Sequence, residues 1–311
     1  MNKFPYSFDN KRYHTYNYFL KTKYSKKIAK VSLNAGFTCP NRDGACGFGG
    51  CIFCSDSGSG DFAGNVEDSL DKQFQDVSQI MRRKWPECQF IAYFQANTNT
   101  YGSIELLKAT FEPFVHKKDV VGIAIATRAD CLSEEICDYL YELSLKCDLY
   151  VELGLQTIHD QTAKLIHRGH DYQTFVEGVN RLRQRSIDVC VHIINGLPYE
   201  TYDMMIETAK DVGQLDIQGL KIHNLFILKN TQLHQMYLEN PFSMLSRDEY
   251  ISLVVDQLSY IPAHVVIERL TGDAPINELV EPLWSIKKVT ILNDIDKLMK
   301  AKDCYQGDKI G

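Results

Sequence analysis

The sequence predicts an α/β fold built on a parallel β-sheet, and three observations support this prediction. Short, almost unbroken apolar segments alternate with longer segments of helical periodicity. Near-continuous hydrophobicity is typical of strands that are buried on both faces, as in parallel sheets. Irregular polar segments follow one strand after another, where α/β proteins build their sites. Six strand–helix repeats indicate a sheet that is either doubly wound or closed partly or wholly into a barrel.

Six segments are predicted to be the strands of this sheet: KVSLN from Lys30, QFIAYF from Gln89, VVGIAIA from Val120, LYVELGL from Leu149, DVCVHII from Asp188 and IQGLKIHNLFIL from Ile217. The clearest helix is VEDSLDKQFQDVSQIMRRKW, where apolar residues recur at helical spacing from Val66 and Pro86 marks the end. Another helix is expected to begin at Ser133, a typical N-cap residue. Beyond about residue 240 the sequence predicts a helix over 247–260, a strand HVVIERL and a final helix from about Trp284.

The charge balance argues against a protein coated with nucleic acid, because the 311 residues carry a net charge of −6. The basic residues are unevenly distributed, in three groups: Lys3, Lys11, Arg12, Lys21, Lys23, Lys26, Lys27 and Lys30; Arg181, Arg183 and Arg185; and Lys287, Lys288, Lys297, Lys300 and Lys302. Each group is either a solvated surface or part of a footprint for a phosphate backbone.

We expect a cytoplasmic protein that does not enter a membrane. No segment approaches the roughly 20 apolar residues that span a bilayer, and the start of the chain lacks an apolar signal core. Ten cysteines in a reducing compartment argue against a disulfide framework. A local cluster of cysteines is therefore interpreted as a metal-binding or catalytic site.

Such a cluster lies in CPNRDGACGFGGCIFC, which holds four cysteines within sixteen residues. Cys39, Cys51 and Cys54 can supply three thiolates in a C-x11-C-x2-C arrangement. The glycines between them relax the backbone and let amide groups approach an anionic centre. Three cysteines alone do not choose among metals.

Two other ligand sets remain open from the residues alone. Cys46 with Cys51 and Cys54 forms C-x4-C-x2-C, the start of a plant-type ferredoxin pattern, although an incidental loop thiol is the simpler interpretation of Cys46. For zinc, the remaining partners of the CIFC pair would be His167 and His170 in HRGH.

The loop GFTCPNRDGACGFGGCIFC resembles the cluster loop of the radical S-adenosylmethionine (SAM) superfamily, and within it the YhcC/YtqA (MnmL-like) group related to the Elp3 radical SAM domain. TRAD, VELGLQT followed by HRGH, and HIINGLPYET are similar to later motifs of that superfamily. FQANTNTY, KIHNLFILKNTQL and RLTGDAP fit the narrower group. The resemblance therefore covers most of the chain, from about Asn34 to about Pro275.

The resemblance implies a partial (β/α)6 TIM-type barrel with a C-terminal α/β extension. Residues 1–30 would be a basic N-terminal arm, residues 31–240 the radical SAM partial barrel, and residues 241–311 an extension packed on the barrel. It also implies that Cys39, Cys51 and Cys54 hold three irons of a 4Fe-4S cluster. The fourth iron would bind SAM, whose reductive cleavage gives a 5′-deoxyadenosyl radical. Cys46 would be an extra sulfur.

Seven further residues are expected by resemblance to bind the cofactor SAM: Asn97, Arg128, Glu152, Gln156, Arg168, His192 and Asn195. Among them, Arg168 would contact the SAM carboxylate and Asn97 its amino group, while His192 and Asn195 lie on the strand that meets ribose and adenine. No catalytic residue is assigned.

Structural interpretations of the same residues stay open. Gln156 and Asn195 could be turn or capping residues at strand ends, and Arg128 could pair with Glu152 inside the barrel. His192 could be a core histidine with its hydrogen bonds satisfied. Two further residues of the sixth strand are left unassigned, Lys221 and His223.

The resemblance implies a tRNA substrate, with conversion of 5-carboxymethylaminomethyluridine to 5-aminomethyluridine at the wobble position. An external electron donor and a downstream tRNA methyltransferase would be partners. Two alternatives remain: a radical SAM enzyme that acts on a small molecule or a protein, and a non-enzymatic iron–sulfur or zinc-binding protein.

Overall fold

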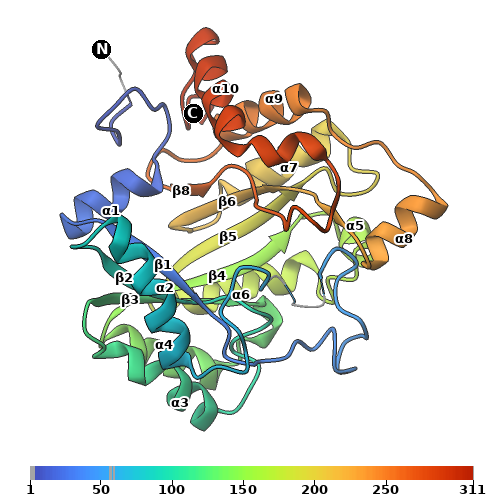
Figure 1. The fold of residues 1–311 in the computed structure, drawn as a ribbon. Helices are drawn as coiled ribbons and strands as arrows, with labels where there is room; N and C mark the ends of the chain where they lie inside the picture. Colours follow the sequence, from blue (N-terminus) through green and yellow to red (C-terminus); the bar gives the residue numbers. More distant parts are fainter. Residues whose placement is uncertain (1–3, 56–57, 59, 311) are drawn as a thin grey trace.

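The computed structural model describes residues 4–55, 58 and 60–310. A curved sheet of seven parallel strands lies at its centre, in the same order as in the sequence (Figure 1). The strands are β1 (Ile28–Leu33), β2 (Gln89–Phe94), β3 (Val120–Thr127), β4 (Asp148–Gln156), β5 (Asp188–Asn195), β6 (Gly219–Asn224) and β8 (Val266–Arg269). Strands β1 and β8 form the two edges, so the barrel is open. The predicted partial barrel is confirmed, with a seventh strand from the C-terminal part of the chain.

Helices between successive strands cover the outer face of the sheet (Figure 1). They are α2 (Leu70–Lys84), α3 (Ile104–Val115), α4 (Glu134–Ser144), α6 (Tyr172–Gln184) and α7 (Tyr202–Val212), while the short α5 (Asp160–Leu165) lies beside the cysteine loop. Their apolar faces and the outward side chains of the strands form the main core, which includes Phe90, Phe94 and Phe111. The inner face of the sheet is therefore free to carry polar side chains.

Helix α2 begins four residues later than its periodicity predicts. Ser69 is its N-cap, and the Ser69 side chain accepts a hydrogen bond from the backbone N–H of Lys72. Val66 lies before this cap and its side chain is exposed. The predicted N-cap at Ser133 is confirmed, because its side chain accepts a hydrogen bond from the N–H of Ile136.

The C-terminal part of the chain adds elements around one edge of the barrel. Helices α8 (Gln232–Glu239), α9 (Arg247–Leu258) and α10 (Lys288–Ala301) lie there, with β7 (Ile227–Leu228) paired antiparallel to β9 (Leu279–Glu281). The expected helix from Trp284 starts as a 3-10 turn and becomes α-helical at Lys288. Among the described residues, none of the helices combines the length and apolar character needed to cross a bilayer.

The segment before the barrel packs against the C-terminal part. Helix α1 (Tyr16–Tyr24) follows Thr15, which pairs with Ile267 in β8. Several basic residues of this segment form ion pairs: Lys11 with Asp296, Arg12 with Asp303 and Lys23 with Asp148. Lys30, counted with the N-terminal basic group, lies within β1. On α6 and just after it, Arg183 pairs with Asp216, and Arg185 with Glu134 and Asp138. Much of the basic surface is therefore charge-compensated.

Candidate functional site

A cavity of about 1210 Å³ opens on the inner side of the sheet. Its walls come from the strands and from the loops at their carboxyl ends, where parallel sheets carry their sites. Cys39, Cys51 and Cys54 all line it. So do six of the seven residues expected to bind SAM: Asn97, Arg128, Glu152, Gln156, Arg168 and His192.

The cysteine loop is tied to the loop that follows β4. The side-chain amide of Asn41 donates to the carbonyl oxygens of His167 and Arg168, at 2.7 and 3.0 Å, and lies 3.5 Å from Cys51 Sγ. Gly169 permits this contact, because its φ is +87° and a Cβ there would lie 2.3 Å from Asn41 Oδ1. This contact joins the cysteine loop to a segment that is far from it in the sequence.

The thiols of the CIFC pair differ in their affinity for a proton. A hydrogen bond from Cys54 lowers the pKa of Cys51 to about 7 against the opposing effect of burial, with help from Arg128. The same hydrogen bond and burial raise the pKa of Cys54 well above its usual value. The electropositive surroundings favour a bound thiolate at Cys51.

Cys46 lies apart from the other three cysteines. It is exposed and lines a separate pocket of about 540 Å³, together with His167 and His170. Within the described part of the chain, no three Cys, His, Asp or Glu side chains converge as ligands of one metal ion. The CxxC and HxxH set considered for zinc is therefore not assembled here.

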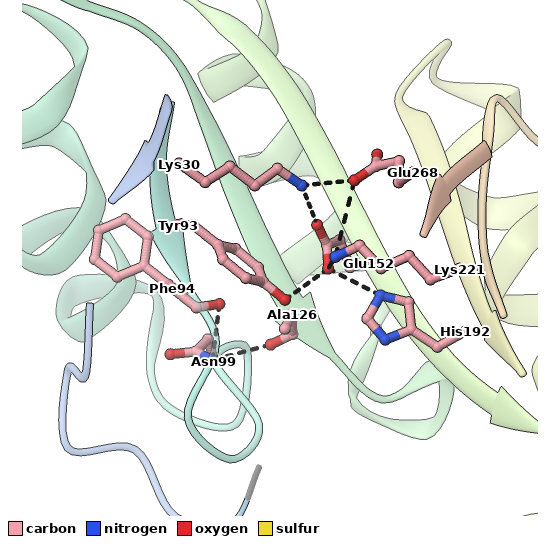
Figure 2. A network of polar contacts seen from close by, with 9 residues as sticks. All are labelled: Lys30, Tyr93, Phe94, Asn99, Ala126, Glu152, His192, Lys221 and Glu268. Atoms are coloured by element: carbon pink, nitrogen blue, oxygen red, sulfur yellow. Dashed lines mark hydrogen bonds and ion pairs between the residues drawn. The ribbon is translucent and has the colours of Figure 1, made fainter. Parts of the chain in front are cut away.

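A network of charged side chains lies inside the barrel around Glu152 (Figure 2). Lys30 Nζ lies 2.7 Å from Glu152 Oε1 and 2.7 Å from Glu268 Oε2. The Tyr93 hydroxyl donates to Glu152 Oε2 at 2.7 Å, and His192 Nε2 lies 2.8 Å from the same oxygen. Lys221 also forms an ion pair with Glu152. The side chains come from β1, β2, β4, β5, β6 and β8.

The charges of this network are mutually dependent. Burial alone would raise the pKa of Glu152, but Lys221 and Lys30 outweigh it and lower the pKa well below its usual value. Burial lowers the pKa of His192, which Lys221 lowers further. At neutral pH we therefore assign a carboxylate to Glu152 and a neutral imidazole to His192.

Asn97 and Gln156 lie at strand ends in left-handed backbone conformations, with φ of 58° and 67°. Gln156 also marks a register shift between β4 and β5. Both side chains line the cavity, and Asn97 Oδ1 is buried without a hydrogen-bond partner among the described residues. Backbone strain of this kind is concentrated at functional sites.

Arg128 and Arg168 both donate hydrogen bonds to backbone carbonyl oxygens. Arg128 pairs with Asp130 and donates to the Arg168 carbonyl at 2.7 Å, so the alternative of an Arg128–Glu152 pair is wrong. Arg168 is buried and donates to the carbonyls of Leu155 and Thr157. It therefore organises the loop that contacts the cysteine segment.

Asn195 is the one expected SAM-binding residue that does not line the cavity. Its side-chain amide exchanges two hydrogen bonds of 2.8 Å with Gln257 of α9. The structure thus joins β5 to α9 through this pair of amides.

Sequence reasoning missed Tyr93 and Glu268, grouped Lys30 with the N-terminal basic residues, and left Lys221 and His223 unassigned. The available signal was a charged residue within an otherwise apolar strand, as in KVSL and GLKIHN. An ionised side chain is almost never fully buried unless it is paired. Which partners meet could not be inferred, because they come from six different strands.

Comparisons with known proteins agree with this geometry. The model of the Radical SAM superfamily matches residues 41–212, and that of the Radical_SAM C-terminal domain matches residues 217–301. The chain is 52% identical to YtqA of Bacillus subtilis over 98% of this chain and 95% of that protein, and 30% identical to YhcC of Escherichia coli K12 over 94% and 93%.

Two further matches are more distant. A tRNA uridine(34) acetyltransferase of Methanocaldococcus infernus is 25% identical, over 60% of this chain and 34% of that protein. The solved structure of Elp3 from M. infernus superposes with a TM-score of 0.68 at 20% identity. That match covers 90% of this chain and 64% of the Elp3 chain, and it shows a shared fold.

Proposed function

The chain belongs to the radical SAM superfamily, and on this premise we propose that it cleaves SAM reductively at a 4Fe-4S cluster and acts on the wobble uridine of tRNA. The reaction we propose converts 5-carboxymethylaminomethyluridine to 5-aminomethyluridine. The bond between the amine nitrogen and the carboxymethyl carbon would break, with SAM as the two-electron oxidant and water as co-substrate, and the two carbons would leave as glyoxylate. Membership of the superfamily supports an enzyme.

The residues present fit the cofactors of this family. Three of the ten cysteines line one cavity, while Cys46 lines another pocket. A 4Fe-4S cluster bonds each cysteine to a different iron, so its ligands need not converge on one point. The buried Asn97 Oδ1, unpaired within the described part of the chain, is a ready acceptor for an ammonium group such as that of SAM.

When bound, the cluster would supply the electron that cleaves SAM to a 5′-deoxyadenosyl radical. Cys39, Cys51 and Cys54 would hold it at the carboxyl edge of the sheet. Asn41 ties the cysteine loop to the His167 carbonyl, and Arg168 holds the loop after β4 by donating to the Leu155 carbonyl. The buried walls of the cavity would exclude water and stray hydrogen donors.

The observation that carries the proposal is one cavity that holds both the three cysteines and the Glu152 network. Strand geometry places Lys30 roughly 10 Å below the end of β1, at about 3.3 Å per residue. The cavity volume, about 1210 Å³, exceeds the range of roughly 300–1,000 Å³ typical of pockets for one small ligand. It has room for SAM and for a nucleoside extruded from the tRNA.

Similarity to tRNA uridine(34) acetyltransferases supports the choice of tRNA as substrate. The net charge of −6 and the paired surface arginines mean that any tRNA contact would depend on a local basic surface rather than on the total charge. Two partners belong to the proposal: an external electron donor and a tRNA methyltransferase that acts on the product.

The test uses the anaerobically reconstituted protein, SAM, dithionite as the reductant, and tRNA that carries 5-carboxymethylaminomethyluridine. We expect 5-aminomethyluridine and 5′-deoxyadenosine to form together, and neither to form with Cys39→Ala. Nucleosides from the tRNA of a deletion strain should show the unprocessed species. An unchanged nucleoside profile in both experiments, with SAM still cleaved, would leave a radical SAM enzyme with another substrate.

A further inference from the structure

Arg269, the last residue of β8, has unused hydrogen-bonding capacity in the cavity wall. Among the described residues its guanidinium makes no hydrogen bond, and its ion pair with Asp273 is long, at 3.8 Å. Lys288 of α10 binds the same Asp273 carboxylate more closely, at 2.6 Å. A guanidinium presents five donors in a planar fork that matches a carboxylate. Arg269 is therefore a cation with room for one more anion.

The wall around Arg269 carries more cations than carboxylates. The cations of this part of the cavity wall are Lys30, Lys221, Arg269 and Lys288, and its carboxylates are Glu152, Glu268 and Asp273. Four cations face three carboxylates, which leaves one positive charge in excess. The two histidines of this wall do not change the count at neutral pH, because burial lowers the pKa values of both His192 and His223.

His223 provides a second, independent observation. It lines the same wall and stacks on His192, with ring centroids 5.6 Å apart. Its Nε2 is buried and has no hydrogen-bond partner within the described part of the chain. Lys221, two residues before His223 on β6, pairs in register with Arg269, and a Cβ at Gly272 would lie 3.5 Å from His223 Nδ1. Arg269 and Lys288 share Asp273, so the three side chains belong to one part of the wall. A buried nitrogen without a hydrogen-bond partner costs free energy, and a ligand that bonds to it would remove this cost.

We propose that Arg269, with Lys288 and His223, forms a subsite for the carboxylate of the substrate. Glu268, the residue before Arg269, lines the same cavity and provides a carboxylate for an ammonium group. The subsite thus fits a group that carries an amine and a carboxylate one carbon apart, as an N-substituted glycine does. This inference rests on the proposed function for the identity of the substrate, since 5-carboxymethylaminomethyluridine ends in such a group.

The test measures equilibrium binding to the reconstituted protein, without reductant and therefore without chemistry. The probes are two free nucleosides, 5-carboxymethylaminomethyluridine and 5-aminomethyluridine, together with SAM. We expect Arg269→Gln to weaken binding of the first nucleoside roughly 10- to 100-fold, as for the loss of a hydrogen bond to a charged group. Binding of the second nucleoside and of SAM should not change. Arg269→Lys should retain part of the preference, because it keeps the charge but not the planar fork.

Arg183→Gln is the matched control, because Arg183 pairs with Asp216 at 2.9 Å and does not line the cavity. It should bind all three probes as the wild type does. The inference is overturned if Arg269→Gln leaves the preference for the carboxylate intact. It is also overturned if Arg269→Gln weakens both nucleosides equally, or if it weakens SAM, which would assign Arg269 to the SAM carboxylate.

A second pair of probes separates this inference from the proposed function. N-benzylglycine and N-methylbenzylamine differ by a carboxylate and contain no uridine. Saturation-transfer NMR should detect N-benzylglycine on the wild type and not on Arg269→Gln. If this preference holds while tRNA nucleosides are neither bound nor converted, the subsite stands and the tRNA proposal falls. If tRNA is converted but Arg269→Gln has no effect on any probe, the proposed function stands and the subsite falls.

Discussion

Lys30 Nζ lies 2.7 Å from Glu152 Oε1 and so joins the first strand of the sheet to the fourth across the inside of the barrel. Strands β1 and β4 do not pair with each other, because β2 and β3 lie between them. A buried charge of this kind is stable only when its partners are all present. The contact therefore links the stability of the half-barrel to the chemistry of its cavity.

Replacing Glu152 with glutamine should destabilise the protein by about 3–5 kcal/mol, because the buried Lys30 and Lys221 would be left with Glu268 as their one shared carboxylate. Urea unfolding at pH 7.5 gives the free energy of unfolding. Glu207→Gln is the control: its side chain is largely exposed, and the expected change is within about 0.5 kcal/mol. Equal stability of the two variants would show that the Glu152 charge is not needed.

The free energy of unfolding should fall as the pH is lowered from 7.5 to 5.5. Burial, Arg269 and His192 hold the pKa of His223 well below that of an unfolded histidine, about 6.5. In this range the unfolded state binds more protons than the folded state, so acid favours unfolding. His223→Gln should show a shallower dependence on pH, measured by urea unfolding at both pH values. An identical slope in the variant would contradict this assignment.

Alanine at Cys39, Cys51 or Cys54 should abolish cluster binding and SAM cleavage, whereas Cys46→Ala should retain both. Cys46 lines a different pocket and is exposed, which makes it the matched control within the same loop. Iron and sulfide content after reconstitution, with 5′-deoxyadenosine formation, are the measurements. Loss of cluster in Cys46→Ala would make it a fourth ligand. One zinc and no sulfide in the wild type would contradict the cluster altogether.

Asn195→Ala should lower the free energy of unfolding by about 1–3 kcal/mol, because the buried amide of Gln257 loses its partner. SAM affinity should change little, since Asn195 does not line the cavity. Asn97→Ala gives the opposite pattern: weaker SAM binding with a smaller effect on stability. Isothermal titration with SAM and urea unfolding distinguish the two. A large loss of SAM affinity in Asn195→Ala would restore the role expected from resemblance.

The sequence by itself determined the order of strands and helices and the place of the cysteine cluster. Apolar strands such as QFIAYF are long enough and apolar enough to specify a buried parallel strand, and Cys51 and Cys54 are close in the chain. These features are local, so periodicity and spacing are sufficient to find them. The start of α2 was misplaced because a single side chain, Ser69, decided it.

Only the tertiary structure decided which polar side chains meet. Lys30, Glu152 and Glu268 are more than 100 residues apart along the chain, and the curvature of the sheet brings Lys30 Nζ to 2.7 Å from each of the two carboxylates. The same curvature leaves Asn195 bonded to Gln257 outside the cavity, whereas His192 and Ile194 of the same strand line it. Successive side chains of a strand point to opposite faces, so the sequence shows which residues share a face. Which face becomes the cavity is set by the curvature of the whole seven-stranded sheet around it.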